Sequence, residues 1–483
     1  MSYRKEKTFS SLCAEHQASH NTLRTSVREE FFASKRQIEG EFIPVVVVPN
    51  EAGLREVIAQ IKLCDVQAMS TYSSYFSETN MLPFNLLIEL NAFEPLFNRA
   101  INNNDDTFNE KFMMFTTNFL VNNQSDIFGR QLINMGFIKV VDKLLDSTSQ
   151  TVVLRCLTTV SNSLANSASN SDAYIRFGIF ERAMSVIQKY KTFETLQTIT
   201  WLFSNICRTR LTTDFTEMTK IADFFLSILV DFDKYSDQIV SDALWGVGYL
   251  AQTRHYESFV TSKELLDTIF QILRHGQYTN LTLRFLGNYA SRNGHEIDLI
   301  VDANVFSLIE NAVMTTTKSS TIKEAYWVLS NIIGGENATY CKTLVTTTQL
   351  IQAAVEAIMQ TKFDNKVLDE MEFVVSNLLY IYDDELIAYI LSRCLDVIRV
   401  YIIILQTSRN TQLISSTLQA VFNVLTFGQK NGTDLVDVFV ALGLPDVLES
   451  IAIYCTDRTK KLVRGLKKQF FPEGSEATSL TDL

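Results

Sequence analysis

One stretch decides the fold: Ile322-Lys323-Glu324-Ala325-Tyr326-Trp327-Val328-Leu329-Ser330-Asn331-Ile332-Ile333. Its apolar residues recur at helical spacing and lie within roughly 100° of one another on a helical wheel: Ile322, Ala325, Leu329, Ile332 and Ile333. Glu324, Trp327 and Asn331 fall on the opposite side of that helix. We therefore expect the Trp327 ring to be left uncovered, with the Asn331 amide one turn away on the same face.

The same arrangement recurs along the chain. A ring four residues before a polar residue, over apolar residues at the same offsets, is found at three further places: Trp201 and Asn205, Trp245 and Tyr249, and Phe373 and Asn377. With weaker copies included, the polar residues follow one another at spacings of 39–46 residues: Asn118, Asn162, Asn205, Tyr249, Asn288, Asn331, Asn377 and Asn423. A period in the forties with helical content is typical of armadillo and HEAT solenoids. We predict an all-α, right-handed superhelical solenoid of about ten repeats.

Composition limits the function. The chain has 483 residues and a net charge of −11, which disfavours a nucleic-acid partner and favours a basic one. Its seven cysteines are scattered and never form a Cys-x-x-Cys pair, so we expect buried thiols in a reducing compartment. The sequence shows no apolar run near the roughly 18 residues of a membrane span and no secretory signal. We expect a soluble intracellular protein without a membrane partner.

The chain divides by composition into four parts. Residues 1–40 form a leader with seven bases and five acids, which we expect to be largely flexible. Residues 41–50 form a connector, in which Val45-Val46-Val47-Val48 is the one place where a strand can be argued. We place the repeats at residues 51–470 and a disordered acidic tail at residues 471–483.

Glycine or asparagine marks the turn before the second helix of several repeats. The residues are Gly136, Gly178, Asn304 and Gly443, each followed by a hydrophobic residue. Such residues favour the left-handed backbone conformation that ends a helix. We therefore expect each repeat to hold a short helix, a turn, a second helix and a longer third helix.

Catalytic and metal-binding patterns are missing from the sequence. The histidines do not have the spacing of metal ligands: His16, His20, His255, His275 and His295. Gly246-Val247-Gly248 lacks the third glycine and the preceding strand of a dinucleotide site. We predict a protein that is not an enzyme and has no metal or cofactor.

Stacked third helices would form a ladder of rings, amides and acids on one surface. Asn amides can hold a peptide backbone in extended form, and Trp rings can receive Lys or Arg side chains at roughly 0.5–2 kcal/mol per cation–π contact. The alternative is structural: each Asn bridges adjacent helices and each Trp fills a gap between repeats. Several pairs in one register favour binding.

Three segments resemble repeats of importin-α (karyopherin-α), the armadillo adaptor that recognises nuclear localisation signals. Lys323–Asn331 resembles the seventh repeat. Asp242–Leu250 resembles the fifth, with Tyr249 in place of the usual Asn, and Leu283–Asn288 resembles the sixth, with Arg284 in the Trp position. The resemblance covers nearly the whole chain. It implies an armadillo fold, Lys/Arg-rich signal peptides, importin-β and a recycling exportin as partners, and shuttling between cytoplasm and nucleus.

The resemblance also implies two signal-binding sites. The minor site would be formed by Arg284, Asn288, Glu324, Trp327, Asn331, Glu370, Phe373 and Asn377. The major site would be formed by Asn118, Asn162, Trp201, Asn205, Asp242, Trp245 and Tyr249. The major site departs from the family, because other residues stand at its Trp and Asp positions and cations precede them: Met114, Thr158, Asn166, Lys111 and Arg155. We therefore expect the minor site, around Trp327, to dominate signal binding.

Within the leader, Val27–Arg36 resembles the end of an importin-β-binding segment. Its matching cations, with one that precedes it, are Arg24, Arg28, Lys35 and Arg36. Two alternatives to the import adaptor remain open. A catenin-like scaffold should have a surface rich in Lys and Arg, whereas Glu324, Glu370 and Asp242 occupy this one. A paralogue could also keep the solenoid as a protein-interaction platform and lose cargo binding.

Overall fold

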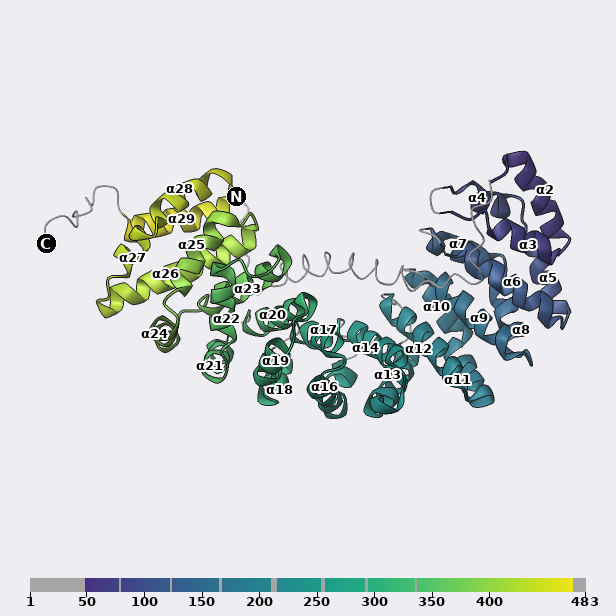
Figure 1. Ribbon diagram of the computed structural model, residues 1–483, viewed down its shortest axis with the longest axis horizontal. Helices are drawn as coiled ribbons and strands as arrows, with labels where there is room; N and C mark the ends of the chain where they lie inside the picture. Colours follow the sequence, from purple (N-terminus) through teal and green to yellow (C-terminus); the bar gives the residue numbers. More distant parts are fainter. Residues whose placement is uncertain are drawn as a thin grey trace, which may run out of the picture. The chain divides into compact units, whose positions relative to one another are not determined.

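The computed structural model describes residues 48–471, except 78–79, 122–123, 165–166, 210–214, 253–256, 292–293 and 335–336. The described residues are almost entirely α-helical (Figure 1) and form two compact units, and the chain passes from one unit to the other after Thr268. We call these the N-terminal unit and the C-terminal unit. The predicted leader, with Arg24, Arg28, Lys35 and Arg36, lies outside the described residues, as do most of Val45–Val48 and most of the predicted tail.

The helices of the N-terminal unit follow one another in short succession. They are α2 Glu51–Lys62, α3 Val66–Ser73, α4 Leu82–Glu89, α5 Phe93–Asn102, α6 Asp106–Phe119, α7 Ser125–Asn134, α8 Phe137–Leu145, α9 Gln150–Ser163, α10 Ala168–Phe177, α11 Ile179–Tyr190, α12 Phe193–Arg208, α13 Phe215–Val230, the 3₁₀ helix η1 Phe232–Lys234, α14 Asp237–Leu250 and α15 Glu257–Val260. The next helix, α16 Lys263–His275, spans the boundary between the units.

The C-terminal unit continues in the same way. Its helices are α17 Thr279–Ala290, α18 Gly294–Asp302, α19 Val305–Met314, α20 Ser319–Ile333, α21 Ala338–Thr347, α22 Leu350–Met359, α23 Asn365–Leu378, α24 Asp384–Arg393, α25 Val397–Thr407, α26 Thr411–Asn431, α27 Leu435–Ala441, α28 Leu444–Tyr454 and α29 Asp457–Phe470.

Most repeats have the predicted three-helix form, and their turns have the predicted backbone. Gly136, between α7 and α8, has φ 98°, and Asn304, just before α19, has φ 63°. Gly178 and Gly443 are also left-handed. Glycine adopts this conformation without the steric cost of a Cβ atom, which is why it ends so many of these helices. Two repeats depart from this form: the first shows only α2 and α3 among the described residues, and the repeat that ends in α14 shows the single α-helix α13 and the short η1 before it.

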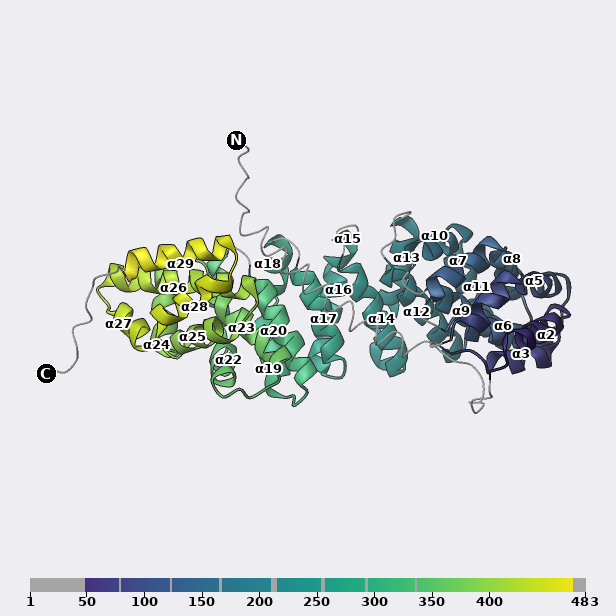
Figure 2. The same ribbon diagram turned by 90° about the horizontal axis from the view of Figure 1, so that it is seen from above.

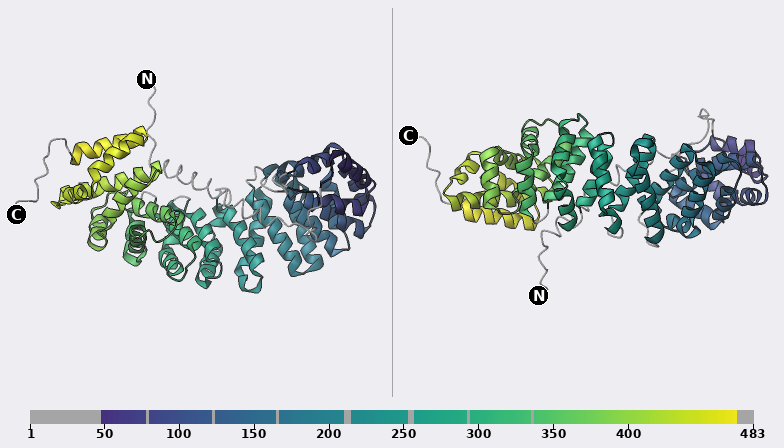
Figure 3. Two further views of the ribbon diagram at one scale, coloured as in Figure 1. Left: turned by 45° about the horizontal axis from the view of Figure 1, so that its top comes forward. Right: turned by 90° about the horizontal axis from the view of Figure 1, so that it is seen from below.

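Within each unit, the third helices of successive repeats pack on one another. In the N-terminal unit α6, α9, α12 and α14 pack in that order, and in the C-terminal unit α17, α20, α23, α26 and α29 do the same. Figure 1 shows α20 beside α17, with α19 and α18 below α20, and Figure 2 shows α17 and α20 as neighbours from above. Figure 3 shows the helices from two further directions. The predicted all-α armadillo-repeat solenoid is confirmed.

The apolar stripe of α20 forms core, as its spacing predicts. Ala325, Leu329 and Ile332 are fully buried, and Ile322 and Ile333 are nearly so. Burying one such side chain contributes about 1.5–3 kcal/mol, so a stripe repeated in every third helix is a principal source of stability.

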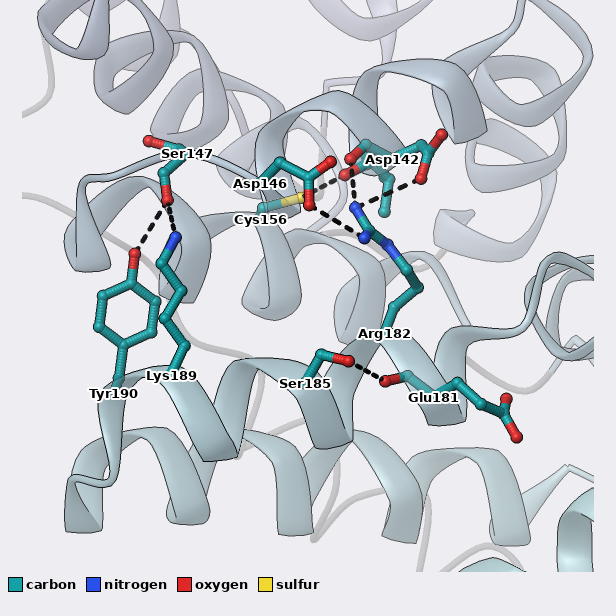
Figure 4. A network of polar contacts seen from close by, with 10 residues as sticks. Asp142, Asp146, Ser147, Cys156, Glu181, Arg182, Ser185, Lys189 and Tyr190 are labelled. Carbon is teal, nitrogen blue, oxygen red and sulfur yellow. Dashed lines mark hydrogen bonds and ion pairs between the residues drawn. The ribbon is translucent and has the colours of Figure 1, made fainter.

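Second helices are also joined from repeat to repeat by polar contacts. In Figure 4, Arg182 of α11 lies 2.9 Å from Asp146 Oδ1 and donates from Nη2 to the Asp142 carbonyl oxygen at 2.7 Å. Lys189 Nζ and the Tyr190 hydroxyl both donate to the Ser147 carbonyl oxygen, at 2.6 and 2.9 Å. These bonds hold α11 against the end of α8 and support the stacking that aligns the third helices.

Candidate functional site

The three tryptophans of the predicted ladder are buried. The exposed fractions are 6% for Trp201, 5% for Trp245 and 4% for Trp327, so the prediction of uncovered rings is wrong. Trp327 lies against Gly287 of α17, where a Cβ atom would come within 1.9 Å of the indole Cζ3. The Trp245 ring stacks on Tyr249 of the same helix, with the ring centroids 5.8 Å apart. A helical wheel shows that each ring lies away from the apolar residues of its own helix. It does not show that the neighbouring helices bury the ring.

The Asn amides of the C-terminal unit bond to the preceding repeat. Asn331 Nδ2 donates to the Gly287 carbonyl oxygen at 2.9 Å, and Asn377 Nδ2 donates to that of Ser330 at 3.3 Å. Each acceptor is among the last four carbonyl groups of its helix, which have no partner within the helix. The amide therefore caps the end of the preceding third helix, as in the structural alternative raised from the sequence.

Asn423 repeats this contact with two acceptors. Its Nδ2 donates to the carbonyl oxygens of Leu379 and Tyr380, at 2.9 and 2.8 Å, just past the end of α23. The Asn register of α20, α23 and α26 thus joins each third helix to the one before it.

Asn162 in α9 differs from these amides. Its side chain is 1% exposed, and neither Nδ2 nor Oδ1 has a hydrogen-bond partner in the part of the chain that the structure describes. An unsatisfied buried polar group costs about 1–3 kcal/mol, and at this burial a ligand could supply the missing bonds only after neighbouring side chains move. An amide can donate two hydrogen bonds and accept two, which matches the N–H and C=O groups of an extended peptide.

The acids of the predicted sites are buried as well. Glu324 Oε1 accepts from Arg284 Nη2 at 2.8 Å, and the two side chains are 5% and 21% exposed. Asp242 Oδ2 accepts from Gln238 Nε2 at 2.7 Å, and Glu370 is also buried. Burial of a carboxylate is costly unless a cation or several donors compensate for it, and Arg284 supplies such a cation to Glu324.

The substituted positions of the predicted major site have their own partners. Arg155 lies 3.4 Å from Glu110, which offsets part of the repulsion that we expect between Arg155 and a cationic peptide. Met114 is half-buried and Thr158 is buried, while Lys111 is exposed. Asn166 lies outside the described residues.

Each unit brings together its own part of the predicted residues. In the N-terminal unit, Asn118, Asn162, Trp201, Asn205, Asp242, Trp245 and Tyr249 lie on consecutive third helices. In the C-terminal unit, α17 carries Arg284 and Asn288, α20 carries Glu324, Trp327 and Asn331, and α23 carries Glu370, Phe373 and Asn377. The residues predicted for the minor site therefore lie on three helices packed in sequence.

Small residues stand directly before six of the seven Asn residues in the series and were missed from the sequence; the seventh, Asn423, follows Phe422. Thr117, Ser161, Ser204, Gly287, Ser330 and Ser376 each precede an Asn of the series. They allow close approach between third helices: the hydroxyl oxygens of Thr117 and Thr159 are 2.6 Å apart, and those of Ser376 and Thr417 are 2.8 Å apart. The recurring small residue was a readable signal of helix–helix contact.

Other kinds of site find no support in the described residues. No cluster of three or more metal-ligating side chains occurs among them, and no helix among them is long and apolar enough to cross a membrane. The cysteines described by the structure are unpaired: Cys156, Cys207, Cys341 and Cys455 are buried, and Cys64 and Cys394 are half-buried.

The chain is similar to two curated importin subunits of Oryza sativa subsp. japonica. It is 24% identical to importin subunit alpha-1a over 207 residues, which are 42% of this chain and 39% of the relative. It is 23% identical to importin subunit alpha-1b over 199 residues, which are 41% of this chain and 37% of the relative. The chain thus matches less than half the length of these relatives. No family model matches it.

Among solved structures, an engineered protein from the Northeast Structural Genomics Consortium superimposes with a TM-score of 0.66 at 18% identity. The superposition covers 85% of this chain and 97% of the engineered one, which supports the fold alone. Taken with the importin similarity, the chain is a divergent, importin-α-like armadillo-repeat protein.

Proposed function

We propose that this armadillo protein is a nuclear-import adaptor that binds Lys/Arg-rich localisation signals along its third helices and links them to importin-β. The observation that carries the proposal is the set formed by Glu324, Trp327 and Asn331 on α20 with Arg284 on α17. It combines an acid, a ring and an amide at the join of two packed helices. The distant similarity to importin alpha subunits supports the same function.

Electrostatics support a cationic ligand. The chain carries a net charge of −11, and its third helices bury Asp242, Glu324 and Glu370. A Lys or Arg side chain of a peptide would reach these buried carboxylates only after the side chains that cover them move apart, and its charge-assisted hydrogen bonds would then be strong. In the N-terminal unit the buried Asn162 amide adds hydrogen-bonding capacity that a peptide backbone would use once its cover moves apart.

The second candidate function is a protein-interaction platform that does not carry cargo. It is favoured by the amides of Asn331, Asn377 and Asn423, which already bond to the preceding helix. It is also favoured by the 4% exposure of Trp327, because a peptide can reach that indole only if side chains around it move apart. A surface used only for repeat stacking would need no such movement.

Titration of the full chain with a fluorescent Lys-rich signal peptide separates the two functions. The adaptor requires saturable binding that weakens between low and high salt, because the contacts are between opposite charges. The matched control is the same peptide with each Lys replaced by Gln, which should not bind. Absence of binding to the Lys-rich peptide at low salt would leave the interaction platform as the function.

The link to importin-β is tested in the full chain as well. The predicted contacts are Arg24, Arg28, Lys35 and Arg36 of the leader. Replacing all four by Ala should abolish capture of the chain by immobilised importin-β and leave signal-peptide binding intact. Failure of the unaltered chain to be captured would rule out the adaptor role while leaving peptide binding as a separate result.

A further inference from the structure

The last described helix, α29, carries a concentration of positive charge in an acidic chain. Between Thr459 and Phe470 it has no acidic residue and five cations: Lys460, Lys461, Arg464, Lys467 and Lys468. The preceding helices α27 and α28 carry acids only, at Asp437, Asp446 and Glu449. Within this part of the C-terminal unit the positive charge is therefore confined to one helix.

The helix has one packed face and one open face. Thr459, Val463 and Leu466 are buried against α26 and α28. The Phe470 ring packs edge-on against the Phe422 ring, with the ring centroids 5.7 Å apart. The opposite face is exposed and is formed by Lys461, Arg464, Gly465 and Lys468. We call these four residues the α29 cationic face. At 1.5 Å per residue it extends for about 10 Å, or roughly the length of three or four residues of an extended peptide.

Gly465 is an unexpected residue at the middle of this face. A glycine inside an exposed helix costs about 1 kcal/mol relative to alanine. No described neighbour requires it, because a Cβ atom there would have nothing within 4 Å. Its absence of a side chain leaves the helix backbone open between Arg464 and Lys468, where another chain could approach closely.

We infer that the α29 cationic face binds an acidic polypeptide segment of a partner protein. The partner would present three or four Asp or Glu side chains in extended form to Lys461, Arg464 and Lys468. A polypeptide fits better than a nucleic acid or an anionic membrane, because the face is short and the acids of α27 and α28 lie on adjoining helices. This surface is separate from the residues proposed to bind localisation signals.

The test is a titration of the full chain with a fluorescent dodecapeptide in which Glu alternates with Gly or Ser. The unaltered chain should bind this peptide at low salt. The variant with Lys461→Glu, Arg464→Glu and Lys468→Glu should bind at least tenfold more weakly. The matched control carries the same charge change at exposed cations elsewhere, Lys318→Glu, Lys362→Glu and Arg399→Glu, and should bind within twofold of the unaltered chain.

Gly465→Ala tests the close approach separately. This substitution should weaken the affinity for the acidic peptide by about threefold to fivefold. The melting temperature of the chain should stay unchanged or rise. The inference would be overturned if the unaltered chain did not bind the acidic peptide. It would also be overturned if the charge-reversal variant and the control variant lost affinity for the peptide equally. So would tighter binding to a twelve-nucleotide oligouridine, or to vesicles of phosphatidylcholine with one-fifth phosphatidylserine, than to the peptide. Signal-peptide binding, measured in parallel, should not change in any of these variants.

Discussion

The Trp327 indole lies directly against Gly287 of the preceding third helix, so close that a Cβ atom there would overlap the ring at 1.9 Å. The same glycine offers its carbonyl oxygen to Asn331, one turn beyond the ring. The Trp–Asn pair that a peptide would contact is therefore also the pair that holds α20 to α17. In the proposed function, peptide binding and repeat stacking would use the same side chains.

Gly287→Ala should force the Trp327 ring from its place. Overpacking of a buried contact typically costs about 1–3 kcal/mol, and we expect a loss of stability in this range with a shift in tryptophan fluorescence. Gly465→Ala is the control, because that position has open space and should gain roughly 0.5–1 kcal/mol. Chemical denaturation of both variants measures the difference, and equal stabilities would contradict the Trp327–Gly287 contact.

Asn423→Ala should destabilise the C-terminal unit by about 1–3 kcal/mol, because the carbonyls of Leu379 and Tyr380 lose their donor. Asn431→Ala in the same helix removes an exposed bond to Phe427 and should cost less than about 0.5 kcal/mol. Urea unfolding of the two variants provides the comparison. If Asn431→Ala lowered the free energy of unfolding as much as Asn423→Ala, the hydrogen bonds between repeats would contribute no more to stability than an exposed bond within one helix.

Arg284→Met removes the guanidinium that is paired with buried Glu324. Breaking one side of a buried ion pair costs roughly 3–5 kcal/mol, and the 21% exposure of Arg284 places this pair toward the lower end. Adding Glu324→Gln to the same chain should recover part of the loss. A double-mutant cycle by thermal or chemical unfolding measures the coupling, and additive losses would show that the pair contributes nothing.

Glu372 should make the stability depend on pH. Burial, followed by the charge of Asp369, raises the pKa of Glu372 from 4.5 to about 7. In the unfolded chain the carboxyl ionises near 4.5, so the folded state holds the extra proton between these values. Stability should therefore fall as pH rises from 4.5 to 7 and then level off, with a total effect of about 3 kcal/mol.

Glu372→Gln should remove this decline and make the chain more stable than the unaltered protein at pH 8. Asp369→Asn should move the decline to lower pH, because it removes the second cause of the raised pKa. Unfolding free energies measured from pH 4.5 to 8 test both statements. Parallel profiles for the unaltered chain and Glu372→Gln would contradict them.

The sequence predicted the repeats well because their signals are local. The apolar stripe of α20 and the left-handed turns at Gly136 and Asn304 depend on residues a few positions apart. The state of the site depends on neighbours about forty residues away, which one helical wheel does not contain. Gly287 of the preceding repeat packs against the Trp327 ring and helps to bury it. The carbonyl oxygen of Gly287 in turn accepts a hydrogen bond from Asn331 Nδ2. In the sequence, contacts between repeats are signalled only by the small residue that precedes most of these Asn residues.

The most direct test compares two tryptophans in one assay, by titrating a Lys-rich signal peptide into Trp327→Ala and Trp201→Ala variants of the full chain. We expect Trp327→Ala to weaken binding at least tenfold and Trp201→Ala to weaken it less. Tyr326→Phe is the control for folding, because it removes a buried bond to the Leu350 carbonyl oxygen and should leave affinity unchanged. Loss of binding in Trp201→Ala alone would contradict a dominant site around Trp327.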